Sequence, residues 1–394
     1  MGALLAGAAG CGPPEEPHRA ERDHVQKLLD RQARAVRDKD ERAYLASVSP
    51  GPGERGYRDA QRDVFRNLER LPLAEWSYRA SGVQVPRDGG FTAQVRLSYR
   101  LRGHDRAPVT TTERLAFDKR GGRWYLTGEL PGSAPQLWEQ GRIRLVRGER
   151  SLVLGVGRDE DELRSLAREA DRAVTAVAKE WPHHWPHRVV LEVPGSLRRM
   201  AELLDAPASS YQGIAAVTTG EAGASERAPA DRIVVNPEAY GLLGESGRQV
   251  VMTHETVHVA TRTATSDATP LWLSEGLADW VAYRGGDSSP RQVAPELARA
   301  VRASGPPRTL PSDRDFRFGG DQQTMGRAYE GSWLACRMIA DLWGTGRLAA
   351  LYRKVGEGER HDPARLDRVL REELGVSTRK LTAWWRDYLE RELG

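Results

Sequence analysis

The chain has 394 residues and a formal net charge of +4, with 39% hydrophobic and 29% charged residues, a composition typical of a globular protein of two or three domains. The basic residues are mostly Arg and are spread among Asp and Glu without runs interleaved with aromatics, which argues against nucleic-acid binding. No apolar run approaches the ~20 residues that a transmembrane helix requires.

Residues 1–22 are expected to be the remnant of a signal sequence and a tether. A short run of small and apolar residues ends at Ala9-Gly10-Cys11, and a polar, Pro-rich stretch follows. The run resembles the end of a bacterial lipoprotein signal peptide, although Ala8 stands where Leu is usual and no basic residue precedes it. This resemblance implies that Cys11 carries a lipid that anchors the protein to the outer face of the cell membrane. The alternative is a disordered, Ala-rich N-terminus of a cytoplasmic protein.

Residues 23–135 are predicted to form an α+β domain, in which helices precede a meander of antiparallel strands. Apolar spacing predicts helices over residues 24–36, 41–48 and 57–71, and strands over residues 76–80, 91–101, 109–117 and 124–130. The order resembles the α+β cone of cystatin-like and nuclear-transport-factor-2-like domains. This resemblance implies a structural role, or a pocket that binds a ligand.

Residues 145–394 are predicted to form a second domain, after a linker that begins at residues 131–135. Its first half is expected to hold a small mixed sheet. The predicted elements are strands over 143–146, 151–156, 189–193, 214–218 and 233–235, and helices over 159–181 and 197–204. Residues 181–187 are rich in His, but their prolines exclude the helical spacing that would join two imidazoles. A turn is therefore predicted there.

The segment Val250–Ala260 contains His-Glu-x-x-His in an apolar run without Gly or Pro. Residues four apart lie on one face of an α-helix, so His254 and His258 present two imidazoles with the spacing of two ligands of a tetrahedral zinc ion. Glu255 lies beside them, where a carboxylate acts as general base on a metal-activated water. The alternative for this segment alone is a helix with two hydrogen-bonded histidines.

A second apolar, helix-like run, Leu271–Trp280, follows Pro270. It carries Glu275, whose charge would be costly on an apolar face without a partner. Two His and one Glu form a known catalytic zinc set that leaves a fourth position for water. Asp279 follows one turn later on the same side and is expected to accept the second N–H of a ligand histidine.

Together, the two segments resemble the gluzincin metallopeptidases, and the wording Trp272-Leu273-Ser274-Glu275-Gly276 resembles the peptidase MA-like branch. The resemblance implies a zincin-like domain, Zn²⁺ as cofactor and a peptide or protein substrate. It also implies that an edge strand before the metal helix, here residues 214–219, pairs with an extended substrate.

Residues 285–321 are predicted to be surface loop apart from one helix over 295–303, and this loop is a candidate to line or cover the cleft. A buried helix is expected to start at Ala328-Tyr329. It resembles the Tyr-x-x-Gly helix of the peptidase MA-like group, which implies that the Tyr329 hydroxyl stabilises an oxyanion. Glu330 and His361 are lesser candidates. The alternative for Tyr329 is a residue at the edge of the core.

The rest of the chain is predicted to be helical over 345–355, 363–374 and 378–393, with Cys336 a buried free thiol. The sequence therefore predicts a zinc metallopeptidase, lipid-anchored outside the cell membrane. Two alternatives stay open. One is an inactive, surface-anchored binding module that uses the N-terminal pocket and has a structural metal site. The other is a cytoplasmic location, if Cys11 is not processed.

Overall fold

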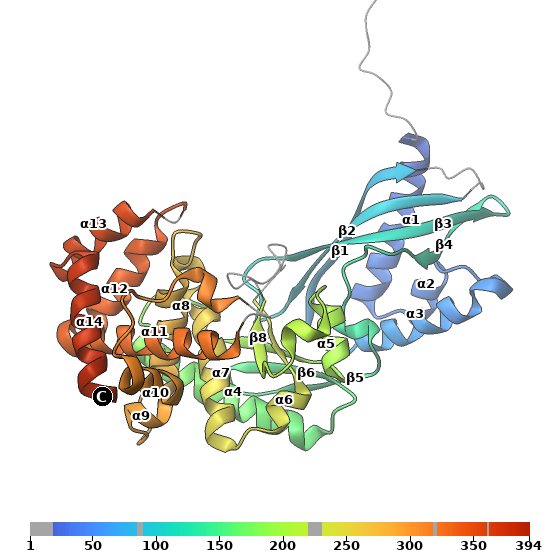
Figure 1. Ribbon diagram of the computed structural model, residues 1–394. Helices are drawn as coiled ribbons and strands as arrows, with labels where there is room; N and C mark the ends of the chain where they lie inside the picture. The colour runs from blue at the N-terminus through green and yellow to red at the C-terminus, as the bar shows by residue number, and fades with distance from the viewer. Residues whose placement is uncertain (1–18, 85–89, 220–230, 318–320, 361) are drawn as a thin grey trace, which may run out of the picture. The chain divides into compact units, whose positions relative to one another are not determined.

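Figure 1 shows the computed structural model, which describes residues 19–84, 90–219, 231–317, 321–360 and 362–394. Cys11, His361 and most of the 220s loop lie outside these residues. The chain divides into two compact units. The first comprises residues up to Glu69 together with Leu73–Arg100 and Thr110–Ala134, and the second comprises Pro135–Gly394 with the short segments Arg70–Pro72 and Leu101–Val109.

The first unit combines three α-helices with a four-stranded sheet. Its helices are α1 (Arg19–Asp38), α2 (Glu41–Leu45) and α3 (Arg55–Leu68), with the 3-10 turn η1 (Pro52–Glu54) before α3. Its strands are β1 (Leu73–Gln84), β2 (Phe91–Leu101), β3 (Val109–Arg120) and β4 (Arg123–Glu129), arranged in the order β1-β2-β3-β4. The predicted meander is therefore present, and α1 packs against the sheet (Figure 1).

Alternating burial along the strands explains how this sheet meets α1. In β2, Val95 and Leu97 are fully buried, whereas Gln94 and Arg96 are exposed and Ser98 is half-buried, which is the period of a strand with one face on a core. From α1, Leu28 and Leu29 join Val95 in one apolar cluster. Helix α1 begins five residues before the predicted start. The prediction missed its first turns because they are polar and show no apolar periodicity.

The second unit begins with a five-stranded mixed sheet of order β5-β6-β7-β9-β8. Its strands are β5 (Ile143–Arg147), β6 (Ser151–Val156), β7 (Val189–Val193), β8 (Ala216–Thr218) and β9 (Ile233–Val235). Strands β6, β7 and β9 run parallel, whereas β5 and β8 pair antiparallel at the two edges. The long helix α4 (Glu160–Glu180) connects β6 to β7, as a parallel pair requires.

Helices make up the rest of the second unit. They are α5 (Leu197–Leu203), α6 (Pro237–Gly241), α7 (Glu245–Thr261), α8 (Leu271–Tyr283), α9 (Pro290–Val293), α10 (Pro295–Ser304), α11 (Gln322–Trp343), α12 (Thr345–Gly356), α13 (Pro363–Leu374) and α14 (Thr378–Leu393). One continuous apolar core joins α4, the sheet and helices α7 to α14. In the described part of the chain, no helix is long and apolar enough to cross a membrane.

The section before α11 differs from the prediction. In place of a loop with one helix, it holds α9, α10 and the 3-10 helix η5 (Asp313–Phe316), and Phe316 is buried in the core. Helix α11 begins at Gln322, six residues before the predicted start. The side chain of Asp321 caps it by accepting a 2.9 Å hydrogen bond from the backbone N–H of Thr324.

Candidate metal centre

Helix α7 carries the His-Glu-x-x-His segment through the interior of the second unit. It packs against α4, α8 and strand β8, so every residue from Met252 to Thr261 except His254 is buried. Buried hydroxyls on such a helix need acceptors. Thr256 and Thr261 donate to the backbone carbonyls of Met252 and Val257, four residues earlier, at 2.7 and 3.0 Å.

Helix α8 lies against both α7 and α11. Its first backbone N–H, from Leu271, donates to the carboxylate of Asp313 at 2.9 Å, which caps a helix that begins after a proline. Its contact with α11 depends on Gly276, because a methyl group at that position would overlap the backbone carbonyl of Ser332. This close approach fixes the height and rotation of α8, and hence the position of Glu275.

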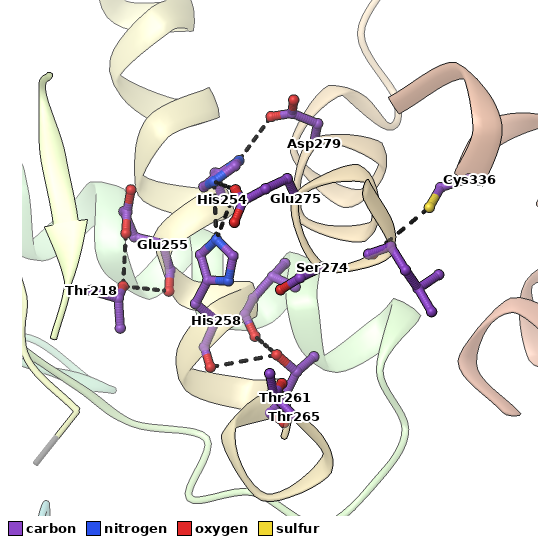
Figure 2. Close-up of polar contacts among 12 residues, drawn as sticks. Thr218, His254, Glu255, His258, Thr261, Thr265, Ser274, Glu275, Asp279 and Cys336 are labelled. Carbon is purple, nitrogen blue, oxygen red and sulfur yellow. Dashed lines mark hydrogen bonds and ion pairs between the residues drawn. The ribbon is translucent and has the colours of Figure 1, made fainter. Parts of the chain in front are cut away.

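The structure brings three ligand atoms from these two helices together (Figure 2). Nε2 of His254 lies 3.1 Å from Nε2 of His258 and 3.2 Å from Oε2 of Glu275, and Nε2 of His258 lies 3.5 Å from the same oxygen. Two ligands at zinc–nitrogen and zinc–oxygen distances of ~2.0–2.1 Å from a tetrahedral ion are about 3.3 Å apart. The donor set and its spacing therefore fit a zinc ion.

Asp279 fixes the orientation of the first histidine. Its Oδ1 lies 2.8 Å from Nδ1 of His254, which places the hydrogen of a neutral imidazole on Nδ1 and leaves the lone pair on Nε2. Nε2 of His258 and the carboxylate oxygen of Glu275 face this lone pair. A carboxylate buried against two imidazoles needs a positive charge shared with them, from a metal ion or a proton.

The pKa shifts of the site residues also indicate that the site favours a positive charge. Burial by itself would lower the pKa of His254, but the carboxylates of Asp279 and Glu275 outweigh it and raise that pKa well above its usual value. Burial would likewise raise the pKa of Glu275, but the two histidines hold that pKa well below its usual range. The pocket therefore stabilises a positive charge among these side chains, which a proton supplies in the metal-free protein.

Glu255 points away from the three ligands, toward strand β8 (Figure 2). It is buried, and its Oε2 accepts a 2.7 Å hydrogen bond from the hydroxyl of Thr218, the last residue of β8. The same hydroxyl lies 3.0 Å from the backbone carbonyl oxygen of Glu255. The candidate general base is thus attached to the edge strand of the sheet.

Tyr329 lies half-buried on α11 near the first histidine. Its ring centroid is 6.3 Å from that of His254 and 5.2 Å from that of Phe316 in η5. The structure thus places Tyr329 beside the site. Glu330 has a different task, because its carboxylate accepts hydrogen bonds from the backbone N–H groups of Glu296 and Leu297 and caps α10.

The remaining candidates lie elsewhere or serve packing. The ring of His183 meets that of Trp181 edge-on, and the ring of His187 lies tilted against that of Trp185, so the His-rich segment is an aromatic turn. Cys336 is a buried free thiol, and burial raises its pKa. Across the described ranges, the only group of three or more His, Cys, Asp or Glu side chains that could hold a metal ion is the one at α7 and α8.

Two residues that contact the site were not predicted from the sequence. Thr218 has no motif around it, and only the expectation of an edge strand at residues 214–219 pointed to its neighbourhood. Asp313, which caps α8, lies in a section that reads as loop. Both contacts join residues about 40 positions apart, which no local spacing rule detects.

No protein-family model matches the chain, and no curated protein matches it in sequence. Among solved structures, the M1 zinc metallopeptidase from Deinococcus radiodurans is 15% identical over 68% of this chain and 58% of that chain, with a TM-score of 0.37. A variant of that enzyme bound to the substrate Tyr-Ser-Ala matches at 14% identity over the same shares, again with a TM-score of 0.37. Yeast LTA4 hydrolase is 11% identical over 82% of this chain and 61% of that chain, with a TM-score of 0.37. The chain spans less than two thirds of these neighbours, and likenesses of this size do not establish a shared fold.

Proposed function

We propose that this protein is a zinc-dependent peptidase of the gluzincin type. The observation that carries the proposal is the convergence of His254, His258 and Glu275 at tetrahedral spacing, with the carboxylate of Glu255 on the same helix. A purely structural zinc site is typically closed by four protein ligands, whereas a catalytic one keeps an open position. The three residues of this site leave such a position.

Each side chain has a defined task in this proposal. His254, His258 and Glu275 would hold the ion, and Asp279 keeps His254 in the tautomer that offers Nε2. A bound zinc ion supplies Lewis acidity, which polarises a carbonyl oxygen and acidifies water. The Glu255 carboxylate takes the proton of the attacking water and delivers it to the leaving amine. The hydroxyl of Tyr329 is assigned to the developing oxyanion.

Strand β8 is the proposed guide for the substrate. Among the described strands it lies at the edge of the sheet and pairs antiparallel with β9, and an edge strand is the place where an extended peptide adds to a sheet. Through Thr218 it also touches the candidate base. A peptide added to this edge lies along the strand that contacts Glu255.

The test is a Glu255→Gln variant of the full chain, loaded with zinc and offered an unbiased peptide mixture. We expect about one zinc per chain and a loss of hydrolysis of at least ~100-fold, because an amide cannot take the proton. Glu245→Gln, at an exposed position in the first turn of the same helix, is the matched control and should keep full activity. Unchanged hydrolysis by the Glu255 variant would refute the mechanism.

The second candidate is a binding module without activity. The first unit has a hollow of about 560 Å³, lined by α1 and by strands β1, β2 and β3, with mostly polar side chains. If the wild-type protein binds zinc and cleaves nothing in the peptide mixture, the binding module replaces the peptidase as the proposed function.

The proposed location is the outer face of the cell membrane, through a lipid on Cys11. The support is the short apolar run that ends at Ala9-Gly10-Cys11. Partitioning of the protein between detergent and water tests it.

A further inference from the structure

We propose that Thr218 is a positioning residue for the general base, holding one oxygen of Glu255 so that the other receives the proton. The inference rests on the proposed function and adds to it a residue outside both metal helices. The hydroxyl of Thr218 lies 2.7 Å from Oε2 of Glu255 and 3.0 Å from the backbone carbonyl oxygen of the same residue (Figure 2). Both acceptors thus belong to one residue.

The strand holds Thr218 firmly in place. Thr218 has no exposed surface, and it stands opposite Ile233 in the antiparallel pairing of β8 with β9. The next residue, Thr219, accepts the Arg232 backbone N–H at its hydroxyl, and its own N–H donates to the Arg232 carbonyl at 2.8 Å. Its carbonyl also accepts a hydrogen bond from the side chain of Arg262, beyond the end of α7. The end of β8 is therefore tied to α7 through Glu255 and to Arg262, the residue that follows α7.

The chemistry of a hydroxyl suits a base that changes charge. The single hydroxyl proton of Thr218 donates to Oε2 of Glu255 at 2.7 Å, and this bond fixes the carboxylate in one orientation. Oε1 is then the oxygen assigned to take the proton from water. When the carboxyl turns to deliver that proton, the hydroxyl still has an acceptor 3.0 Å away in the Glu255 carbonyl. Its buried donor is thus satisfied at both stages.

A packing role for Thr218 makes a different prediction. Valine has nearly the shape of threonine and would fill the same space, whereas serine keeps the hydroxyl and loses a methyl group. If Thr218 only packs, Thr218→Val is mild and Thr218→Ser is the more harmful change. If it positions the base, the order is reversed.

The experiment compares zinc-loaded full-length wild type, Thr218→Val and Thr218→Ser on one peptide that the wild type cleaves. We expect Thr218→Val to lower kcat about 10- to 100-fold, with KM within about twofold and zinc content unchanged. Thr218→Ser should return kcat to within about threefold of the wild type. In a Glu255→Gln background, Thr218→Val should have no further effect, because there is no base left to position.

A matched control removes another buried hydroxyl from the same region. Thr261 is as buried as Thr218 and donates to the backbone carbonyl of Val257, so Thr261→Val tests the loss of a hydroxyl that does not touch Glu255. It should keep wild-type kcat. If Thr218→Val does not fold, Thr218→Ala is compared with Thr218→Ser in its place.

The outcomes separate this inference from the proposed function. A wild type that binds zinc and cleaves no peptide overturns both. An active wild type with wild-type kcat in Thr218→Val, or a Thr218→Ser variant no better than Thr218→Val, overturns the role of Thr218 alone.

Discussion

Asp279 shows how one side chain beyond the three candidate metal ligands affects the chemistry of the site. Its carboxylate accepts from Nδ1 of His254 at 2.8 Å and is one helical turn from Glu275. It therefore fixes the tautomer of His254 and adds negative charge to the pocket. The tautomer and the negative charge both favour a metal cation at Nε2 of His254. The negative charge of Asp279 also favours a proton at that nitrogen.

We expect an Asp279→Asn variant to bind zinc about 10- to 100-fold more weakly than the wild type, because the amide keeps the shape and loses the charge. Competition titration with a chromophoric chelator measures the affinity. Asp287→Asn, which changes an exposed carboxylate just beyond α8, is the control. Equal zinc affinity in the Asp279 variant and the wild type would contradict this role.

The size of the Asp279→Asn effect should depend on pH. The pKa of His254 is raised in the metal-free protein, so near neutral pH the imidazole holds a proton that zinc must displace. Zinc affinity of the wild type therefore rises with pH until the pH passes that raised pKa. In the Asp279→Asn variant, His254 holds its proton less tightly. The difference in zinc affinity between the wild type and this variant should therefore be largest at high pH.

At the scale of single residues, the sequence predicted those contacts whose geometry follows from the spacing of residues along an element. The pairing of His254 with His258 follows from the helical repeat, and the carboxylate of Glu275 in an apolar run needed a partner. Thr218 and Asp313 could not be found in this way. Their contacts depend on how strand β8 and helix η5 pack against α7 and α8, and many buried threonines and exposed aspartates look the same in sequence.

The pair of helices α8 and α11 positions Glu275 through a contact that tolerates no side chain. Gly276 faces the backbone of Ser332, and the thiol of Cys336 lies close to the same spot. This close approach packs α8 tightly against α11, and α8 also lies against α7. The rotation of α8 about its own axis, which aims Glu275 at the histidines, is thereby fixed.

Gly276→Ala should push α8 away from α11. We expect a loss of about 1–3 kcal/mol in the free energy of unfolding, typical of an overpacked core, together with weaker zinc binding because Glu275 moves with the helix. Urea denaturation and a zinc titration measure the two effects. Gly326→Ala, in α11, is the control. An added methyl group there meets only Glu296 at 3.8 Å, and the variant should be no less stable than the wild type.

Elements were predictable where apolar periodicity was strong and their ends carried clear signals. The bounds of β2, β7, α13 and α14 agree with the prediction for this reason. The first turns of α1 and α11 were missed because they are polar, and in α11 the cap of Asp321 supports the helix instead. Short elements such as α9 and η5 have too few residues to show a period, and the core holds them.

At the scale of the whole molecule, the proposed lipid on Cys11 would determine the cellular location of the protein. We expect the wild type, produced in a bacterial host, to partition into detergent and a Cys11→Ala variant to stay in the aqueous phase, since the variant lacks the residue that would carry the lipid. Cys336→Ala, which removes the buried thiol, is the control and should partition as the wild type does. Wild type and Cys11→Ala together in the aqueous phase would favour the cytoplasmic alternative.

All three candidate ligands belong to the single helical hairpin α7–α8, and this has a consequence for the unfolded protein. Joining the histidines to Glu275 closes a loop of about 20 residues, whose length-dependent entropic cost is only about 2.7 kcal/mol. An unfolded chain can therefore chelate the ion with the same residues, although more weakly. Because binding to the unfolded state offsets binding to the native one, zinc should raise the unfolding temperature by less than its native affinity implies.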